Sequence, residues 1–301
     1  MKSPARHLSG SVMYHILAIV VVSIWGSTLV STKLLMHAGM RAEEVFVARF
    51  LIAYMAILPF APKKVFADNW RDELLMLMLG VTGGSLYFIT ENMAVGITYV
   101  NNVSFIVSTS PIITMVFILM RYRYLKVKRI LIIGSLLALL GIGIVIFNGQ
   151  VMLKLNPMGD LLAAAAALCW GVYSYLIKIL GDRYDTVFIT RKVFFYGVLT
   201  SLPFFLVNPW QYDLTGLTNW HVMLNLLFLG MVASFMCFVL WNIAITKLGA
   251  VTISNYCYLI PMATVVFSAI FLDEPMTLMA YTGSAFILVG VYLANKGCAD
   301  D

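Results

Sequence analysis

Ionisable and hydroxyl-bearing side chains stand inside otherwise apolar stretches of this sequence. Arg49 and Glu91 lie within or at the end of such stretches, and Asn101, Ser104 and Ser108 recur at i, i+3 and i+7. That spacing places the three polar residues on one face of a helix. Amides and hydroxyls can hydrogen-bond a small molecule, but no acid–base pair suited to catalysis accompanies them. The pattern therefore predicts a polar binding cavity within an apolar bundle, without catalytic residues.

Further stripes of polar and aromatic residues have the same helical spacing in both halves of the chain. We expect them to converge on one cavity that takes an amphipathic small molecule, with aromatic rings covering its apolar part. The residues predicted to bind this substrate are Trp25, Tyr87, Asn101, Ser104, Ser108, Trp170, Ser174, Trp241, Ser254 and Tyr258. Helix packing is the alternative role for the serines, and interfacial anchoring is the alternative for tryptophan and tyrosine.

The composition shows what surrounds most of the chain. Of 301 residues, 61% are hydrophobic and only 11% are charged, whereas a soluble domain carries about 25% charged residues. The lipid bilayer is therefore the expected environment. The net charge of +6 is attributed to loops that face anionic headgroups, and not to nucleic-acid binding.

A span of the bilayer needs about 20 mostly apolar residues. The stretches that meet or approach this length are 12–35, 44–60, 73–92, 100–120, 128–148, 158–180, 187–207, 220–245, 250–272 and 276–295. All are expected to be helices, since lipid does not tolerate irregular backbone. The predicted fold is an all-α integral membrane protein with ten transmembrane helices.

The distribution of lysine and arginine predicts the orientation. With a cytoplasmic N-terminus, the inner segments contain Lys2, Arg6, Lys63, Lys64, Arg71, Arg121, Arg123, Lys126, Lys128, Arg129, Arg183, Lys247 and Lys296. The outer loops then contain only Arg41 and Lys154. This positive-inside bias predicts that both termini are cytoplasmic. The expected location is the plasma membrane, namely a bacterial inner membrane.

The order of motifs in the first half recurs in the second. Trp25-Gly26 recurs as Trp170-Gly171 after 145 residues, and other repeated motifs recur after 142, 150 and 149 residues. We assign residues 1–150 and 151–301 to two five-helix repeats. Because five is odd, the repeats are expected to be inverted around a central cavity, an arrangement typical of secondary transporters.

Depth along the predicted helices places a group of charges at each mouth of the cavity. Lys33, Arg49 and Glu91 are expected near the outer mouth, and Lys178 and Arg191 near the inner mouth. We hypothesise that Glu91 pairs with Lys33 or Arg49 and closes the outer mouth, so these five residues are assigned to gating or coupling. For Lys33 and Arg49, the alternative is that they reach the headgroups.

The inner mouth lacks an acidic counterpart, because Trp241 stands at the position that Glu91 holds in the first half. Lys178 and Arg191, with the neighbouring Lys192, are therefore expected to attract a carboxylate or phosphate of a substrate. The alternative is pairing with Asp182 or Asp185.

Pro111 and Pro261 lie in the middle of the fourth predicted helix of each half. A proline frees the carbonyl four residues earlier, here that of Val107 or Cys257. The two prolines are predicted hinges; a packing kink is the alternative.

Other classes of site find no support in the motifs. No G-x-x-x-x-G-K loop is present, the four histidines form no i, i+4 pair, and the four cysteines have no metal or disulfide spacing. No cofactor and no metal are therefore expected.

The doubled motifs resemble the EamA branch of the drug/metabolite transporter superfamily. The resemblance covers the whole chain and is carried by Trp25-Gly26, Trp170-Gly171, the segment from Asn242 to Val251, the Pro261 helix, and the run from Phe271 to Pro275 followed by Gly283 and Gly290. Tyr124 departs from the pattern at the position that corresponds to Glu274.

This resemblance implies ten helices around a central cavity, with the last helix of each half at the periphery. It also implies a secondary transporter that exports or exchanges small metabolites, often amino acids. The alternative function is an integral-membrane enzyme or sensor with a lipid-like substrate. The energy source, protons or a substrate gradient, stays open, as does the choice between monomer and homodimer.

Overall fold

The computed structural model describes residues 4–97, 100–122, 128–147, 156–271 and 277–298. These residues form helices joined by short loops, with no strand among them. In the first half the helices are α1 (Pro4–His37), α2 (Ala42–Ile57), η1 (Leu58–Phe60), α3 (Trp70–Gly80), η2 (Val81–Ser85), α4 (Leu86–Ile97), α5 (Val100–Val107), α6 (Ser110–Arg121) and α7 (Arg129–Phe147). In the second half they are α8 (Pro157–Gly181), α9 (Thr186–Val207), η3 (Leu214–Thr218), α10 (Trp220–Leu227), η4 (Phe228–Met236), α11 (Cys237–Leu248), α12 (Ala250–Ser254), η5 (Asn255–Leu259), α13 (Ile260–Phe271) and α14 (Leu278–Cys298).

Within the described part of the chain, eight helical segments are long and apolar enough to cross a membrane. They are Trp70–Ala94, Val103–Arg121, Arg129–Ile146, Pro157–Gly181, Thr186–Val207, Trp220–Leu248, Ala250–Phe267 and Leu278–Cys298. The predicted stretches 12–35 and 44–60 are also helical. The first lies within α1, and most of the second lies within the 16 residues of α2, which ends before Pro59 enters η1.

Side-chain caps mark several helix starts. The Asn69 side chain accepts a hydrogen bond from the amide of Asp72 at the start of α3. At the start of α9, Asp185 accepts from the amides of Val187 and Phe188. These caps satisfy amides that have no partner within the helix. They therefore fix where the chain enters α3 and α9.

Several long helices change hydrogen-bond register in their interior and remain helical there. η2 and η4 are π-helical, and η5 is a 3₁₀ segment. All five residues of η5 are buried, and so are Gly83, Gly84 and Ser85 of η2. At these buried residues, neighbouring helices keep the backbone away from lipid.

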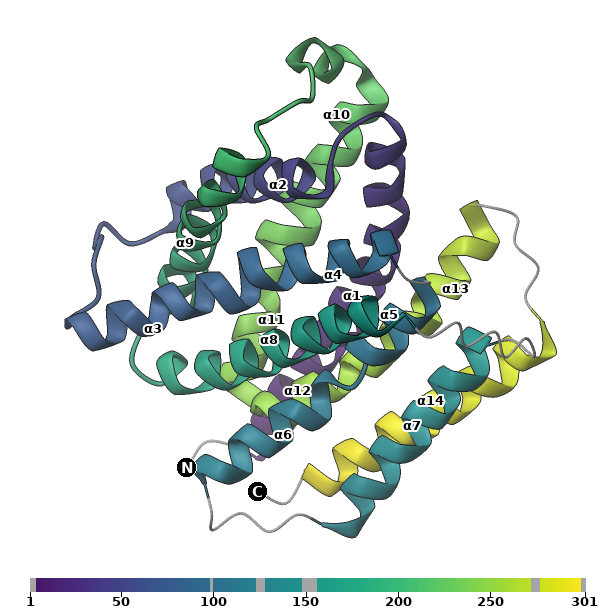
Figure 1. Cartoon of the computed structure of the whole chain (residues 1–301). Coiled ribbons are helices and arrows are strands. Elements are labelled where there is room, and N and C mark those ends of the chain that lie inside the picture. Colours follow the sequence, from purple (N-terminus) through teal and green to yellow (C-terminus); the bar gives the residue numbers. More distant parts are fainter. Residues whose placement is uncertain (1–3, 98–99, 123–127, 148–155, 272–276, 299–301) are drawn as a thin grey trace.

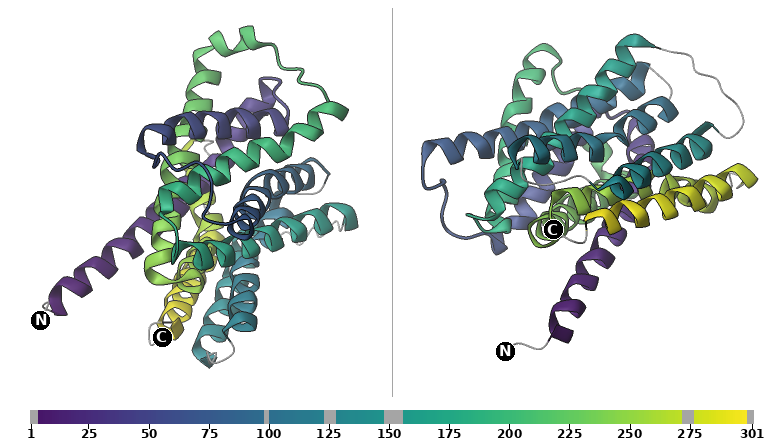
Figure 2. Two further views of the ribbon diagram at one scale, coloured as in Figure 1. Left: turned by 90° about the vertical axis from the view of Figure 1, so that its left-hand side faces the viewer. Right: turned by 90° about the horizontal axis from the view of Figure 1, so that it is seen from below.

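The two halves pack against each other throughout. α1 contacts α11 and α13, and α8 contacts α4 and α6. α2 lies against η4, and α9 lies against α3 and η2. Figure 1 shows these helices gathered in one body, and Figure 2 shows the N-terminal end of α1 projecting from it.

α7 and α14 lie side by side at the edge of the molecule (Figure 1). Glycines allow this close approach: a Cβ on Gly290 would lie 2.7 Å from the carbonyl oxygen of Gly134. Likewise, a Cβ on Gly141 would lie 2.6 Å from the carbonyl oxygen of Gly283. Small residues at such contacts are the usual means of packing helices in lipid.

Replacing Gly290 with valine should destabilise the protein, because the added side chain meets the backbone of α7. Overpacking of this kind costs about 1–3 kcal/mol, which corresponds to a melting temperature lower by several degrees. Thermal unfolding in detergent measures the change. Leu288→Val, at a position 53% exposed on the same helix, is the control and should leave the melting temperature nearly unchanged. Equal stability of Gly290→Val and the wild type would contradict the α7–α14 contact.

Candidate functional site

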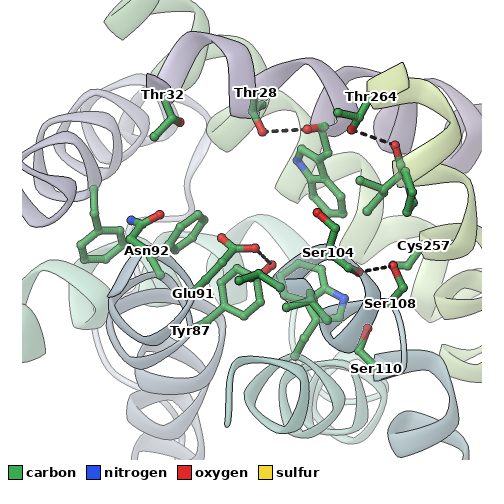
Figure 3. Close-up of a pocket in the computed structure, with 18 of the residues that line it drawn as sticks. Thr28, Thr32, Tyr87, Glu91, Asn92, Ser104, Ser108, Ser110, Cys257 and Thr264 are labelled. Carbon is green, nitrogen blue, oxygen red and sulfur yellow. Dashed lines mark hydrogen bonds between the residues drawn. The ribbon is translucent and has the colours of Figure 1, made fainter. Parts of the chain in front are cut away.

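A cavity of about 130 Å³ lies between the two halves of the molecule. Figure 3 shows its polar lining residues on several helices that surround one space. The lining residues are Trp25, Thr28, Thr32, Val45, Phe46, Arg49, Tyr87, Phe88, Glu91, Asn92, Val103, Ser104, Val107, Ser108, Ser110, Trp170, Phe238, Cys257, Ile260, Pro261 and Thr264. A cavity of about 150 Å³ can hold benzene, so this one suits a small organic molecule.

The cavity lies toward one face of the bundle. The first half lines it with the C-terminal half of α1, the start of α2, the end of α4 and α5, and the second half adds residues of α8, α11, η5 and α13. In a chain that passes back and forth through the bundle, these helix ends lie on the same side, opposite the start of α1. The cavity therefore belongs to the side away from the N-terminus.

Arg49 and Glu91 supply opposite charges to the cavity wall. Nε of Arg49 donates to Oγ of Ser234 at 2.9 Å, and the guanidinium carbon lies 4.7 Å from the centre of the Phe88 ring. Arg49 is 5% exposed, so its side chain does not extend to the surface. Oε1 of Glu91 accepts a 2.8 Å hydrogen bond from the hydroxyl of Tyr87 (Figure 3). A guanidinium can bind a carboxylate, and a carboxylate can bind an ammonium group.

Hydroxyl groups line another part of the wall. The hydroxyl of Ser108 donates to the carbonyl oxygen of Ser104 at 2.7 Å, and that of Thr28 donates to the carbonyl oxygen of Trp25 at 2.7 Å. Thr264 donates to the carbonyl oxygens of Gly26 and Ile260. Because each of these protons is bonded to backbone, the hydroxyl oxygens can still accept hydrogen bonds from a ligand.

Aromatic rings pack beneath the cavity. The ring of Trp25 lies 5.3 Å from that of Trp170, edge to face, and 4.9 Å from that of Trp241. Phe238 packs on both Trp25 and Trp170, at 5.9 and 6.1 Å. Trp25 and Trp170 come from equivalent positions of the two halves, so the two copies of the Trp-Gly motif contact each other at the centre of the bundle.

The structure brings many of the sequence-predicted residues together. The cavity wall contains Trp25, Tyr87, Ser104, Ser108, Trp170, Arg49, Glu91 and Pro261. Ser174, Trp241, Ser254 and Tyr258 do not line it: each is 0% exposed and lies in the packed interior. The side chains of Lys33 and Asn101 lie outside the described residues, as does the turn that contains Glu274.

The predicted hinge prolines differ in their surroundings. Pro111 does not kink a continuous helix but stands in the first turn of α6, where its missing N–H costs nothing. Pro261 follows η5, and the amide of Ile260 donates to the carbonyl oxygen of Cys257. The carbonyl expected to be freed by Pro261 therefore already has a partner, because the helix tightens into a 3₁₀ turn.

On the other side of the tryptophans the bundle is closed by buried polar contacts. The hydroxyl of Tyr173 donates to Oδ1 of Asn242 at 2.8 Å, and Nδ2 of Asn242 donates to Oγ1 of Thr190 at 3.0 Å. Asn242 is 0% exposed, whereas its repeat counterpart Asn92 lines the cavity. Equivalent residues of the two halves thus differ in access to solvent.

An ion-pair cluster lies further along this closed side. We use that name for Asp72, Glu73, Arg183, Tyr184, Lys192 and Tyr196. Nη1 of Arg183 lies 2.7 Å from Oδ1 of Asp72, and the Tyr184 hydroxyl donates to the other Asp72 oxygen at 2.7 Å. Lys192 and Tyr196 both donate to Oε1 of Glu73. The cluster joins α3 of the first half to α9 of the second and to the loop between α8 and α9.

Burial, together with the hydrogen bond to Asp72, raises the pKa of Tyr184 in the loop before α9. The hydroxyl therefore keeps its proton and remains a donor. In the loop before α3, the hydrogen bond from Lys64 lowers the pKa of Asp68. Asp68 therefore stays ionised opposite Lys64.

The remaining basic residues of the predicted inner mouth have protein partners. Lys178 lies 3.4 Å from Asp182, the pairing given above as the alternative. Arg191 donates to the carbonyl oxygens of Pro62 and Lys64. Lys192 is paired with Glu73. These contacts do not leave a basic vestibule in this conformation, because Asp182 pairs with Lys178 and the first half supplies acceptors for Arg191 and Lys192.

A smaller set of contacts joins the halves on the cavity side. Glu44 is 0% exposed and accepts hydrogen bonds from the amides of Gln211 and Tyr212. Arg41 donates to the carbonyl oxygens of Asn208 and Pro209. On the cavity side, the loop between α1 and α2 therefore bonds the loop after α9. On the closed side, the loop between α8 and α9 correspondingly bonds the segment that follows α2.

Sequence reasoning missed several residues of these sites. Asn92 was available as a member of a repeated motif, and Glu73 as an acid at the start of a predicted span. Nothing in the local pattern identified Thr28, Thr264 or Phe238. Among the described residues, no group of three or more histidine, cysteine or acidic side chains is arranged to hold a metal ion.

Removing Glu73 should destabilise the protein, since the Lys192 side chain is only 5% exposed and loses its partner. Leaving a buried charged donor unsatisfied costs roughly 1–3 kcal/mol. Thermal unfolding of Glu73→Ala should show this loss, and adding Lys192→Met should restore part of it. If the double variant is less stable than Glu73→Ala, the pairing is not the source of the effect.

The sequence pattern of the EamA-like transporter family matches this chain twice, over residues 12–147 and 157–296. An uncharacterized transporter of Archaeoglobus fulgidus is 23% identical over 93% of this chain and 96% of its own length. A probable terminal-alkyne amino-acid exporter of Streptantibioticus cattleyicolor is 24% identical, covering 86% of this chain and 84% of its own. A probable amino-acid metabolite efflux pump of Salmonella typhimurium is 23% identical, with 92% and 93% covered.

One solved crystal structure shares the fold. It superposes with a TM-score of 0.76 over 96% of this chain and 97% of its own, at 16% identity. The fold, the apolar helices and the two family matches lead to one conclusion. The chain belongs to the EamA-like transporter family, and it is a multi-pass membrane transporter and not an enzyme.

Proposed function

We propose that this protein exports small metabolites, amino acids among them, by alternating access between two inverted five-helix repeats. The observation that carries the proposal is the cavity, because both halves line it and it holds a guanidinium, a carboxylate, hydroxyls and indole rings. The names of two relatives, an amino-acid exporter and an amino-acid metabolite efflux pump, support this substrate class.

The packing between helices supports the inverted repeat and the division near residue 150. α1 packs against α11 and α13, and its counterpart α8 packs against α4 and α6. A Cβ on Gly26 would meet Ala263, and a Cβ on its counterpart Gly171 would meet Ile113. Each contact therefore has a partner in which the halves exchange roles, as a two-fold axis in the membrane plane requires.

The basic residues support an orientation with both termini in the cytoplasm. The N-terminus and the loops with Lys63, Lys64 and Arg183 then lie inside. In that orientation the cavity faces outward and the ion-pair cluster closes the cytoplasmic side. The proposed location is a bacterial inner membrane.

The cavity chemistry suits a zwitterion. Arg49 is placed to receive a carboxylate and Glu91 to receive an ammonium group, while Trp25, Trp170 and Phe238 cover an apolar side chain. Opposite charges separated in one small cavity also discriminate against solutes with a single charge, since one buried group would then lose its solvation without a partner.

Glu91 is in addition the proposed site of coupling. It is the acidic residue on the cavity wall, and it can release its Tyr87 hydrogen bond to bind a proton or a substrate ammonium. In the empty outward-closed state it is proposed to pair with Arg49 or Lys33. Export driven by a proton gradient would then require Glu91, whereas exchange driven by substrate alone would not.

Counterflow into proteoliposomes tests the function. Vesicles loaded with an unlabelled amino-acid mixture should accumulate labelled amino acids, and vesicles with denatured protein should not. Absence of counterflow for every amino acid offered would reject this substrate class.

The matched variants are Arg49→Gln and Glu91→Gln, with Lys296→Gln as a control that removes an exposed charge at the end of α14. Each cavity variant should lower counterflow about tenfold or more, as expected from the loss of one charged hydrogen bond. The control should transport like the wild type. Wild-type rates in Glu91→Gln, with and without a pH gradient, would remove Glu91 from both binding and coupling.

A further inference from the structure

The second half of the chain contains a carbonyl that the helix does not use. In an α-helix the amide of Cys237 would bond the carbonyl oxygen of Ala233, four residues earlier. Here that amide bonds the carbonyl oxygens of Ser234 and Val232 instead, because η4 is π-helical. The Ala233 carbonyl is thereby left without this amide, in a part of the bundle where water is scarce.

Trp25 supplies the missing donor. Its indole Nε1 donates to the carbonyl oxygen of Ala233 at 3.0 Å, and the same side chain lines the cavity. Trp25 thus joins α1 of the first half to the π-helix of the second, at the boundary between the open cavity and the closed side.

The first half carries the same parts in equivalent places. Trp170 stands 145 residues after Trp25, and Gly83 stands 150 residues before Ala233. Gly83 lies in η2, the π-helix of the first half, where the amide of Leu86 bonds the carbonyl oxygen of Val81, five residues earlier, and so passes over that of Thr82, the neighbour of Gly83. An indole donor and a shifted helical register are therefore present twice.

In this conformation the bond from an indole to a π-helix is made by Trp25 and not by Trp170. Trp170 lines the cavity and stacks on Tyr173, with ring centres 5.1 Å apart and planes at 27°. Gly83 is covered by the ring of Tyr173, on which a Cβ at this glycine would be superimposed. Trp25 and Trp170 touch each other, so movement of one ring changes the space available to the other.

We propose that the two tryptophans exchange their hydrogen bonds during transport. When the present side is open, Trp25 donates to Ala233. When the opposite side is open, Trp25 leaves Ala233, and Trp170 donates to the Thr82 carbonyl oxygen beside Gly83, which the register shift of η2 leaves without the amide of Leu86. The inference rests on the alternating access proposed above. Trp25 and Trp170 act in it as positioning residues that select between conformations, in addition to lining the cavity.

Cysteine accessibility tests this exchange without any substrate. In a background whose native cysteines are replaced by alanine, Thr32→Cys reports on the open cavity. Ile177→Cys, at the repeat-equivalent position and 0% exposed here, reports on the closed side. The labelling rate of each cysteine with a small charged thiol reagent is then measured in three backgrounds: Trp25→Phe, Trp170→Phe and Trp220→Phe. Phenylalanine keeps an aromatic ring while it removes the N–H donor and one ring of the indole, and Trp220→Phe makes the same change away from the cavity.

Trp25→Phe should slow labelling at position 32 and accelerate it at position 177, by about two- to tenfold, the range for loss of one hydrogen bond. Trp170→Phe should change both rates in the opposite directions. Trp220→Phe, at a position 62% exposed on α10, should change neither. A general loosening of the fold would accelerate labelling at both positions in both variants, and so cannot imitate this result.

The exchange is overturned if Trp25→Phe and Trp170→Phe shift the two rates in the same direction, or if neither variant shifts them. Counterflow by the same variants separates this failure from failure of the proposed function. Retained counterflow with unshifted labelling would reject the exchange alone. Loss of counterflow in the wild type would reject the transport proposal, whatever the labelling shows.

Discussion

Backbone polar groups that face lipid must find hydrogen-bond partners within the protein, and this requirement decides where the helices of this chain are allowed to break. The break at η5 is wholly buried, and those at η2 and η4 each turn a buried face toward other helices, which includes Gly83 to Ser85 in η2 and Ala233 and Ser234 in η4. Side chains then bond the backbone that the breaks release, as Trp25 does at Ala233. The cavity, its aromatic base and the contacts between the halves are all arranged around these interruptions.

Differences between the two halves, more than their likeness, produce the conformation seen here. Asn92 faces the cavity while Asn242 is bonded to Tyr173 and Thr190 in a dry interior. Glu91 lies in the wall while Trp241 at the equivalent place is fully buried. One side is held by the Arg41 and Glu44 loop contacts, and the other by two ion pairs with additional tyrosine donors.

Sequence patterns predicted the helical fold and part of the cavity, and the reasons are local. Ser104 and Ser108 share a face because a helix has 3.6 residues per turn, and both line the cavity. Ser174, Ser254 and Tyr258 follow the same rule yet lie in the packed interior. Periodicity assigns a face to a residue, but it does not say whether a neighbouring helix covers that face.

The sequence by itself determined that this chain is helical, apolar and doubled, since hydropathy and motif order are properties of short segments. Only the tertiary structure decided which repeated residues face a cavity and which are closed off. It also decided that Glu73 meets Lys192 and that the Trp25 indole meets a π-helix more than two hundred residues away. These pairings depend on how distant helices pack, and in a molecule built from two similar halves small differences in packing decide which side is open.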